Sequence, residues 1–280
     1  ARCVSGLSWI ARVALLLAAG RRVDPGPMGF IPAIVTSTSF PLLVWILGGL
    51  ETPLFAFLLF VSAWLGLLAA DRPAGEAGES PEAMRAVPLN LRAACGAGIC
   101  GALAALTRPE GLIVVGVVGA SLGWQGLKAR RPGLPLAFTA SFLAIFAPFL
   151  AWRIGYYGDL LPNTFYVKGT GGGLDRLKGG LEYSVQFFLS PPFVLPLAGA
   201  GFYLSRRVIG TRGLDRRLII PAVTVVLFTA YVISVGGDHM PAYRFLAPIV
   251  PLLGLLLLFA VRAARNAGWE RAAAAVPGLL

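Results

Sequence analysis

Four short segments carry charged residues directly at the ends of apolar stretches. The segments are GLET at 49–52, LTRPEG at 106–111, YYGDLLPNTFYVK at 156–168 and GGDHMPAYRF at 236–245. Each contains a carboxylate beside Gly, Pro or aromatic residues, and three contain Lys or Arg. Charges at the ends of membrane helices are costly to bury and tend to mark function. These segments are therefore the candidates for binding or catalysis.

The segment at 236–245 is the strongest of the four candidates. Its paired glycines allow the backbone to adopt positive φ and to approach a ligand closely. The polar residues that follow within a few positions are Asp238, His239, Tyr243 and Arg244. A metal site at His239 is not expected, because the chain contains only one histidine.

The other three segments each have a simpler alternative explanation. Glu51 can favour the N-terminus of the following helix through the helix dipole. Arg108 and Glu110 flank a proline and can form a local ion pair. Tyrosines such as Tyr156 and Tyr157 can belong to an interfacial belt. The combination of a carboxylate, an amide and an amine in the 156–168 loop is harder to explain in this way.

Composition determines the class of protein that must position these segments. Hydrophobic residues make up 57% of the 280 residues, charged residues 13%, and the mean hydropathy is +0.76. So few charges cannot cover a water-facing surface, which argues against a cytosolic enzyme, a disordered tail or a secreted disulfide scaffold. The three cysteines form no CxxC motif. A polytopic membrane protein fits.

Stretches without Asp, Glu, Lys or Arg indicate where the chain crosses the membrane. A span needs about 20 apolar residues. We expect nine helical segments in an all-α polytopic transmembrane bundle, forming a single domain over 1–280. The expected segments are 4–20 (broken by Arg12), 25–50, 52–70, 93–107, 111–127, 132–152, 183–205, 218–237 and 245–261. The 25–50 run contains Pro32 and Pro41, and two half-helices are an alternative for it.

Basic residues predict the orientation of these segments. Alternating from a cytoplasmic Arg21–Arg22 pair puts 16 Lys or Arg residues in cytoplasmic loops and 7 on the opposite side. The four polar segments then share the extracytoplasmic side. The net charge of +11 therefore reflects orientation, and nucleic-acid binding is not expected.

The four segments and their order relative to the spans resemble the GT-C superfamily of polytopic glycosyltransferases. Within it, the chain is similar to the mycobacterial terminal β-arabinofuranosyltransferase family. The resemblance covers nearly the whole chain. It implies a GT-C-like bundle in the bacterial inner (plasma) membrane, with an active face outside the cytoplasm.

The resemblance also implies a reaction and roles for individual residues. A sugar would move from a polyprenyl-phosphate donor to a glycan, lipid or protein acceptor of the cell envelope. The resemblance implies no definite cofactor, and a divalent cation is an open alternative. Arg244, Lys168 and Arg108 would hold the donor phosphate. The catalytic candidates, which would orient hydroxyls or take a proton, are Asp238, Asp159 and Glu110. The other candidates for substrate binding are His239, Tyr243, Tyr166, Asn163 and Glu51.

One departure from the family pattern concerns its principal acidic motif. That motif lies in the first outer loop, after the first transmembrane helix, and this region would precede Ala1. We therefore expect an N-terminally truncated fragment that also lacks a C-terminal part. Such a fragment would be inactive by itself, whereas its parent protein would be an enzyme.

Two other classes of function are alternatives to the transferase. A transporter or flippase would carry ionisable residues near the centre of broken helices, often in inverted repeats. The span centres here are nearly free of charge, and no convincing repeat is visible. A non-catalytic membrane subunit that binds a polyprenyl lipid is the other alternative. The sequence does not separate it from the enzyme, because the first outer loop with the acidic motif would precede Ala1.

Overall fold

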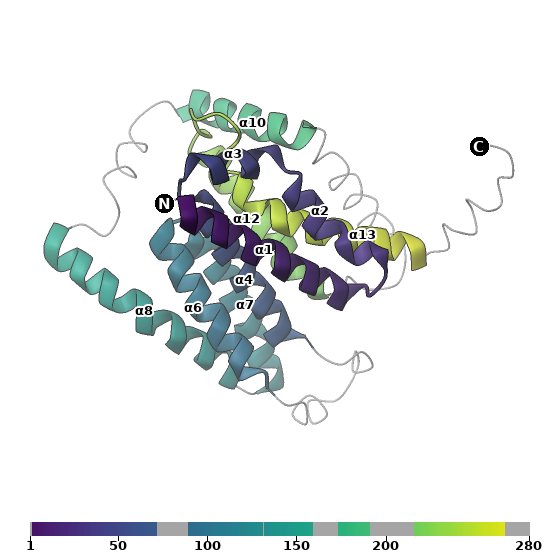
Figure 1. Ribbon diagram of the computed structural model, residues 1–280. Helices are drawn as coiled ribbons and strands as arrows, with labels where there is room; N and C mark the ends of the chain where they lie inside the picture. The colour runs from purple at the N-terminus through teal and green to yellow at the C-terminus, as the bar shows by residue number, and fades with distance from the viewer. Residues whose placement is uncertain (1, 72–88, 131, 159–172, 191–215, 267–280) are drawn as a thin grey trace, which may run out of the picture.

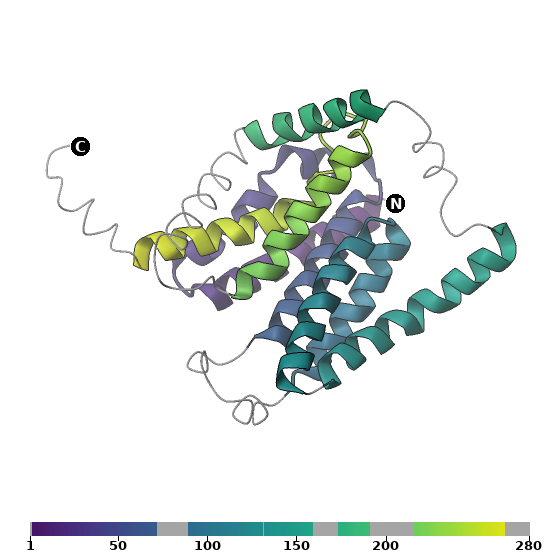
Figure 2. The same ribbon diagram turned by 180° about the vertical axis from the view of Figure 1, so that it is seen from behind.

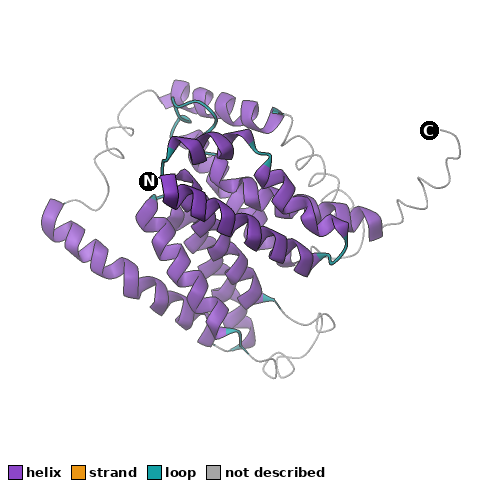
Figure 3. Cartoon of the chain, in the orientation of Figure 1, coloured by secondary structure: helices purple, strands orange, loops and turns teal. Residues whose placement is uncertain are grey.

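The computed structural model describes residues 2–71, 89–130, 132–158, 173–190 and 216–266, and all regular elements among them are helices (Figure 3). The predicted all-α polytopic bundle is confirmed. The longer helices are α1 (Arg2–Val23), α4 (Thr52–Ala70), α6 (Leu91–Thr107), α7 (Gly111–Ala129), α8 (Gly133–Tyr157), α10 (Gly173–Leu189), α12 (Ile219–Ser234) and α13 (Val250–Asn266). The shorter ones are η1 (Pro27–Phe30), α2 (Ile31–Ser37), α3 (Phe40–Gly48), η2 (Arg216–Leu218) and η3 (Ala247–Ile249).

Four helices are long and apolar enough to cross a membrane. They are α1, α4, α7 and α8, and the bent pair of η1–α2 with α3 makes up to a fifth span. Three shorter apolar helices, α6, α12 and α13, stand beside them. The chain is thus a multi-pass membrane protein.

The span from Pro27 to Gly48 is broken, as one of the two alternatives for that run predicted. Its halves meet at an angle of 52°. The backbone becomes extended at Ser39, and Pro41 follows in the first turn of α3. A proline fits the first helical turn because its missing N–H would have no partner there. The second half-helix therefore starts anew instead of continuing the first.

Small residues allow the helices in the centre of the bundle to approach closely. Helix α4 packs against α1, α6 and α7, and α6 packs against α8 (Figure 1). A Cβ atom added to Gly98 of α6 would lie 2.2 Å from Ser141 Oγ and 2.4 Å from the Phe138 carbonyl oxygen of α8. This contact between α6 and α8 therefore requires glycine.

The helix ends form two separate groups of polar contacts. At one end the hydroxyl of Ser5 donates to the Leu50 carbonyl at 3.2 Å, and Arg108 pairs with Glu51. We call this the Glu51 end. At the other, the Asp24 end, Arg217 pairs with Asp71, Arg265 pairs with Asp24, and Arg262 donates to the Val23 carbonyl. The residues at each end are those that the alternating spans place on one side, and which side of the membrane each end faces stays a prediction.

Two segments differ from the expected spans. Residues 183–189 of the expected 183–205 span belong to α10, which begins at Gly173 and lies across the Glu51 end (Figure 2), and residues 191–205 lie outside the described part of the chain. Helix α8 extends beyond residue 152 to Tyr157, where Gly158 ends it with a φ of 74°. A positive φ at the C-terminal cap is the usual role of glycine there.

Candidate functional site

The loop between α12 and α13 has an unusual backbone. Gly236 and Gly237 have φ values of 88° and 76°, which confirms the conformation expected of paired glycines. Ala242 and Tyr243 also have positive φ, at 57° and 48°. Residues with a side chain rarely adopt this conformation, and they adopt it mainly where surrounding contacts enforce it.

Two hydrogen bonds from other helices hold this loop. The indole N–H of Trp45 in α3 donates to the carbonyl oxygen of Ala242 at 3.2 Å. The backbone N–H of Phe245 donates to the hydroxyl oxygen of Tyr183 in α10 at 3.2 Å. Burial raises the pKa of Tyr183, so its hydroxyl stays protonated. The loop is therefore fixed from both sides.

The loop carries a buried ion pair. Arg244 Nε lies 2.8 Å from Asp238 Oδ2, and the side chains are 17% and 0% exposed. The second carboxylate oxygen of Asp238, Oδ1, is buried and accepts no hydrogen bond from the described residues, although His239 Nδ1 lies 3.4 Å away. The His239 side chain itself is 85% exposed. The loop thus presents a fixed carboxylate–guanidinium pair in which one carboxylate oxygen accepts no hydrogen bond from the part of the chain that the structure describes.

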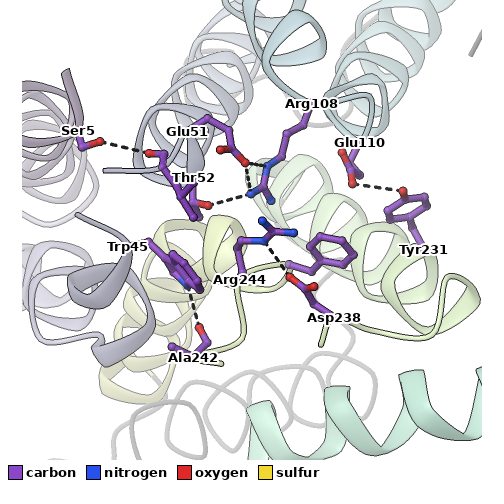
Figure 4. Close-up of polar contacts among 12 residues, drawn as sticks. Ser5, Trp45, Glu51, Thr52, Arg108, Glu110, Tyr231, Asp238, Ala242 and Arg244 are labelled. Carbon is purple, nitrogen blue, oxygen red and sulfur yellow. Dashed lines mark hydrogen bonds and ion pairs between the residues drawn. The ribbon is translucent and has the colours of Figure 1, made fainter. Parts of the chain in front are cut away.

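Arg108 joins the turn after α6 to the turn before α4. Its Nε and Nη2 atoms lie 2.9 and 2.5 Å from Glu51 Oε1, and Nη2 also donates to Thr52 Oγ1 at 2.8 Å. The simpler explanation of this turn, a local ion pair between Arg108 and Glu110, is therefore wrong. Figure 4 shows the reason, since Arg108 points toward Glu51 and Glu110 points toward Tyr231.

Glu51 stands at the N-cap position of α4, but its side chain forms no capping hydrogen bond. Burial raises its pKa, whereas the hydrogen bond from Arg108, a backbone hydrogen bond and the charges of Arg108 and Arg244 lower it. The net result is a pKa below the ordinary value for glutamate. Glu51 is therefore held in the ionised form by two arginines from different segments.

Glu110 binds a residue that the sequence did not single out. The hydroxyl of Tyr231 in α12 donates to Glu110 Oε1 at 3.2 Å. The other oxygen, Oε2, is buried without a hydrogen bond among the described residues. A tyrosine near the end of the apolar 218–237 run was the available signal, because its hydroxyl needs a polar partner when buried.

Phe245 brings the two arginines to one place. The guanidinium carbon atoms of Arg108 and Arg244 lie 5.9 and 5.3 Å from the centre of its ring, at cation–π distance. In Figure 4 both guanidinium groups extend into the region between Glu51 and Asp238. Three of the four polar segments thus converge at the Glu51 end.

The remaining predicted residues do not take part in the polar contacts described above. Tyr243 packs against the rings of Tyr183 and Phe187, with centres 5.4 and 5.6 Å away, so its ring supports the loop. Tyr156 and Tyr157 are exposed on the last turn of α8 and contact each other and Trp152, as in an interfacial belt. The predicted residues that lie outside the described part of the chain are Asp159, Asn163, Tyr166 and Lys168.

The described residues contain no group of three or more His, Cys, Asp and Glu side chains that could hold a metal ion. The site instead combines two arginines with three carboxylates, two of which have an oxygen that no described residue hydrogen-bonds. Arginine can bind an anion such as phosphate, and a free carboxylate oxygen can accept a hydrogen bond from a hydroxyl. The arrangement therefore suits a ligand that carries both a phosphate group and hydroxyl groups.

Comparison with known proteins adds one relative. The chain is similar to a terminal β-(1→2)-arabinofuranosyltransferase of Corynebacterium glutamicum, with 29% identity over 182 residues. The chain is a distant relative of a glycosyltransferase. The match covers 59% of this chain and spans 25% of that protein's length. No family model matches the chain, and no solved structure matches it significantly.

Proposed function

We propose that the chain is part of a membrane glycosyltransferase that takes its sugar from a polyprenyl-phosphate donor. The acceptor would be a glycan, lipid or protein of the cell envelope, outside the cytoplasm. The observation that carries the proposal is the convergence of three polar segments on two arginines and two incompletely bonded carboxylates. The similarity to an arabinofuranosyltransferase supports the same class of reaction.

The proposed reaction assigns a step to each group. The acceptor hydroxyl attacks the anomeric carbon, and its proton passes to a carboxylate base. The bond between that carbon and the phosphate oxygen breaks, and polyprenyl phosphate leaves. Arg244 neutralises the charge that develops on the leaving phosphate, while Arg108 is already bound to Glu51 and Thr52 and holds the site together. Asp238 and Glu110 accept hydrogen bonds from sugar or acceptor hydroxyls.

Substitution in the full-length protein tests this function. Asp238→Asn and Arg244→Ala should each reduce sugar transfer from a radiolabelled polyprenyl-phosphate donor at least about 100-fold, as expected when a charged group in the site is lost. Arg217→Ala at the Asp24 end is the control, because it removes an arginine–aspartate ion pair at the opposite end of the bundle from the site. Full activity of either site variant would overturn the assignment.

A transporter or flippase is the second candidate, and the broken span favours it. Arg12 of α1 is fully buried, donates to the Pro53 carbonyl at 3.3 Å and keeps two nitrogens without a partner among the described residues. Buried charges and broken helices are typical of transport pathways. If the full-length protein moves lipid across vesicle membranes but transfers no sugar, the result would favour a transporter or flippase.

A further inference from the structure

Helix α10 lies across the Glu51 end and packs against the last turn of α12. A Cβ atom added to Gly180 would lie 2.3 Å from the carbonyl oxygen of Ile233, so the two backbones touch. Figures 1 and 2 both show α10 beside the loop that follows α12. The helix therefore has one face fixed on the protein.

The residues of α10 divide into three faces. With 3.6 residues per turn, positions three and four apart share a face. The protein-facing residues are Arg176, Gly180, Tyr183, Ser184 and Phe187. The second face is apolar and exposed, with Leu174 at 75%, Leu177 at 44%, Leu181 at 53% and Val185 at 44%. The third face is polar and exposed, with Asp175, Lys178, Glu182 and Gln186.

We call the exposed apolar face of α10, formed by Leu174, Leu177, Leu181 and Val185, its leucine stripe. The stripe needs an apolar partner, because contiguous apolar surface in water is unfavourable. The surface beside it indicates which partner. Helix α12, on which α10 packs, also exposes apolar side chains in its middle, with Val226 at 64% and Leu227 at 47%. In a multi-pass bundle this is the surface that faces lipid. The stripe on α10 thus stands at one end of a helix whose middle exposes apolar side chains, as lipid-facing helices do.

We propose that α10 lies in the membrane interface at the Glu51 end, with its leucine stripe among the upper acyl chains and its polar face in water. One face on protein, one on lipid and one on water is the arrangement of an interfacial helix that is docked against a bundle. The charges of Asp175, Arg176, Lys178 and Glu182 sum to zero. Burial of apolar surface therefore holds the helix, with no requirement for anionic lipid.

This position links the lipid surface to the candidate site. Tyr183 lies on the protein-facing side of α10 and accepts the hydrogen bond from the Phe245 N–H. Phe245 follows Arg244 directly and lies against both arginine side chains. A helix seated in the membrane therefore fixes the height of the Arg244 loop relative to the bilayer. The inference does not depend on which reaction the site performs.

Site-specific fluorescence tests the position of α10 in the whole chain. Leu181→Cys and Glu182→Cys are made separately in a background with Cys3, Cys95 and Cys100 replaced by Ala, labelled with an environment-sensitive dye and reconstituted into phosphatidylcholine nanodiscs. Val226→Cys on α12 serves as the reference for a lipid-facing site. A shallow doxyl lipid should quench the dye at 181 more strongly than a deep one does, and iodide should quench only the dye at 182. Phosphatidylglycerol in the bilayer should leave the dye at 181 unchanged.

Three other results would overturn the proposal. Quenching by iodide at both positions would place the stripe in water. Quenching by doxyl lipid at both positions would place α10 within the bilayer as a span. A dye at 181 that neither quencher reaches, while Val226→Cys responds to doxyl lipid, would mean that protein covers the stripe, as in contact with a second copy.

Discussion

The two ends of the bundle use the same kind of ion pair but differ in how deeply its arginine is buried. At the Asp24 end, Arg217 and Asp71 keep 34% and 23% of their side-chain surface exposed, and Arg265 keeps 40%. At the Glu51 end, Arg108 and Arg244 keep 8% and 17%. The arginines at the Asp24 end are therefore partly in water, whereas those at the Glu51 end are shielded by the protein. The carboxylates do not divide in this way, since Asp24 is 3% exposed and Glu51 is 39% exposed.

The two ends also differ in what their polar groups leave unused. Among the described residues, the carboxylates with a buried oxygen lacking a hydrogen bond, Glu110 and Asp238, both lie at the Glu51 end. Most buried polar groups in proteins have a partner, and an exception at a shielded site points to a ligand. Similar ion pairs thus have different surroundings at the two ends, and the incompletely bonded carboxylates of the Glu51 end fit the binding site proposed there.

The largest expected effect separates the two ends by stability. Arg108→Met removes three hydrogen bonds and leaves the Glu51 carboxylate, which is 39% exposed, without its partner, so about 1.5–3 kcal/mol of unfolding free energy should be lost. Arg217→Met breaks a partly exposed pair and should cost about 0–1 kcal/mol. Thermal unfolding in detergent micelles measures both. Equal losses would show that burial does not distinguish the two ends.

The next effect concerns the support of the Arg244 loop. Trp45→Phe removes the indole donor and leaves the Ala242 carbonyl without this bond, at a cost of about 1–3 kcal/mol. The full-length variant should also lose sugar transfer, because the loop that carries Arg244 is no longer held from α3. Unchanged transfer in a measurably destabilised protein would mean that the bond serves stability alone.

A smaller effect compares backbone strain at the two ends. Ala242 at the Glu51 end and Arg130 at the Asp24 end both have positive φ, at 57° and 50°. Glycine adopts this conformation without penalty, so Ala242→Gly and Arg130→Gly should each gain about 1 kcal/mol of stability. Only Ala242→Gly should lower transfer in the full-length protein, because it loosens the site. A loss of transfer in both variants would remove this distinction.

The sequence predicts most of the helices and their shared polar ends, because charge-free runs and charges at helix ends are local signals. Nine membrane segments were expected, whereas the described residues form four helices of spanning length and up to a fifth as a bent pair. The sequence does not predict partners. Arg108 pairs with Glu51 across 57 positions instead of with the nearby Glu110, and Glu110 binds Tyr231 across 121 positions. Such pairings depend on how the helices pack. The sequence did not predict helix α10, because the charge-free run at 183–205 overlaps the second half of an amphipathic helix that begins at Gly173.

The smallest expected effect tests the ionised state of Glu51. Its pKa in the folded protein is lowered, so its contribution to stability is complete above the ordinary glutamate value of about 4.3 and is lost as the pH falls through the lower folded value. The Glu51 side chain is 39% exposed, which makes this contribution modest. In urea unfolding followed from pH 7 to 3, Glu51→Gln should begin less stable and show a shallower loss below about pH 4. Parallel pH profiles for both proteins would mean that Arg108 and Arg244 do not hold Glu51 ionised, and the Glu51 end would then lose one of the features that set it apart from the Asp24 end.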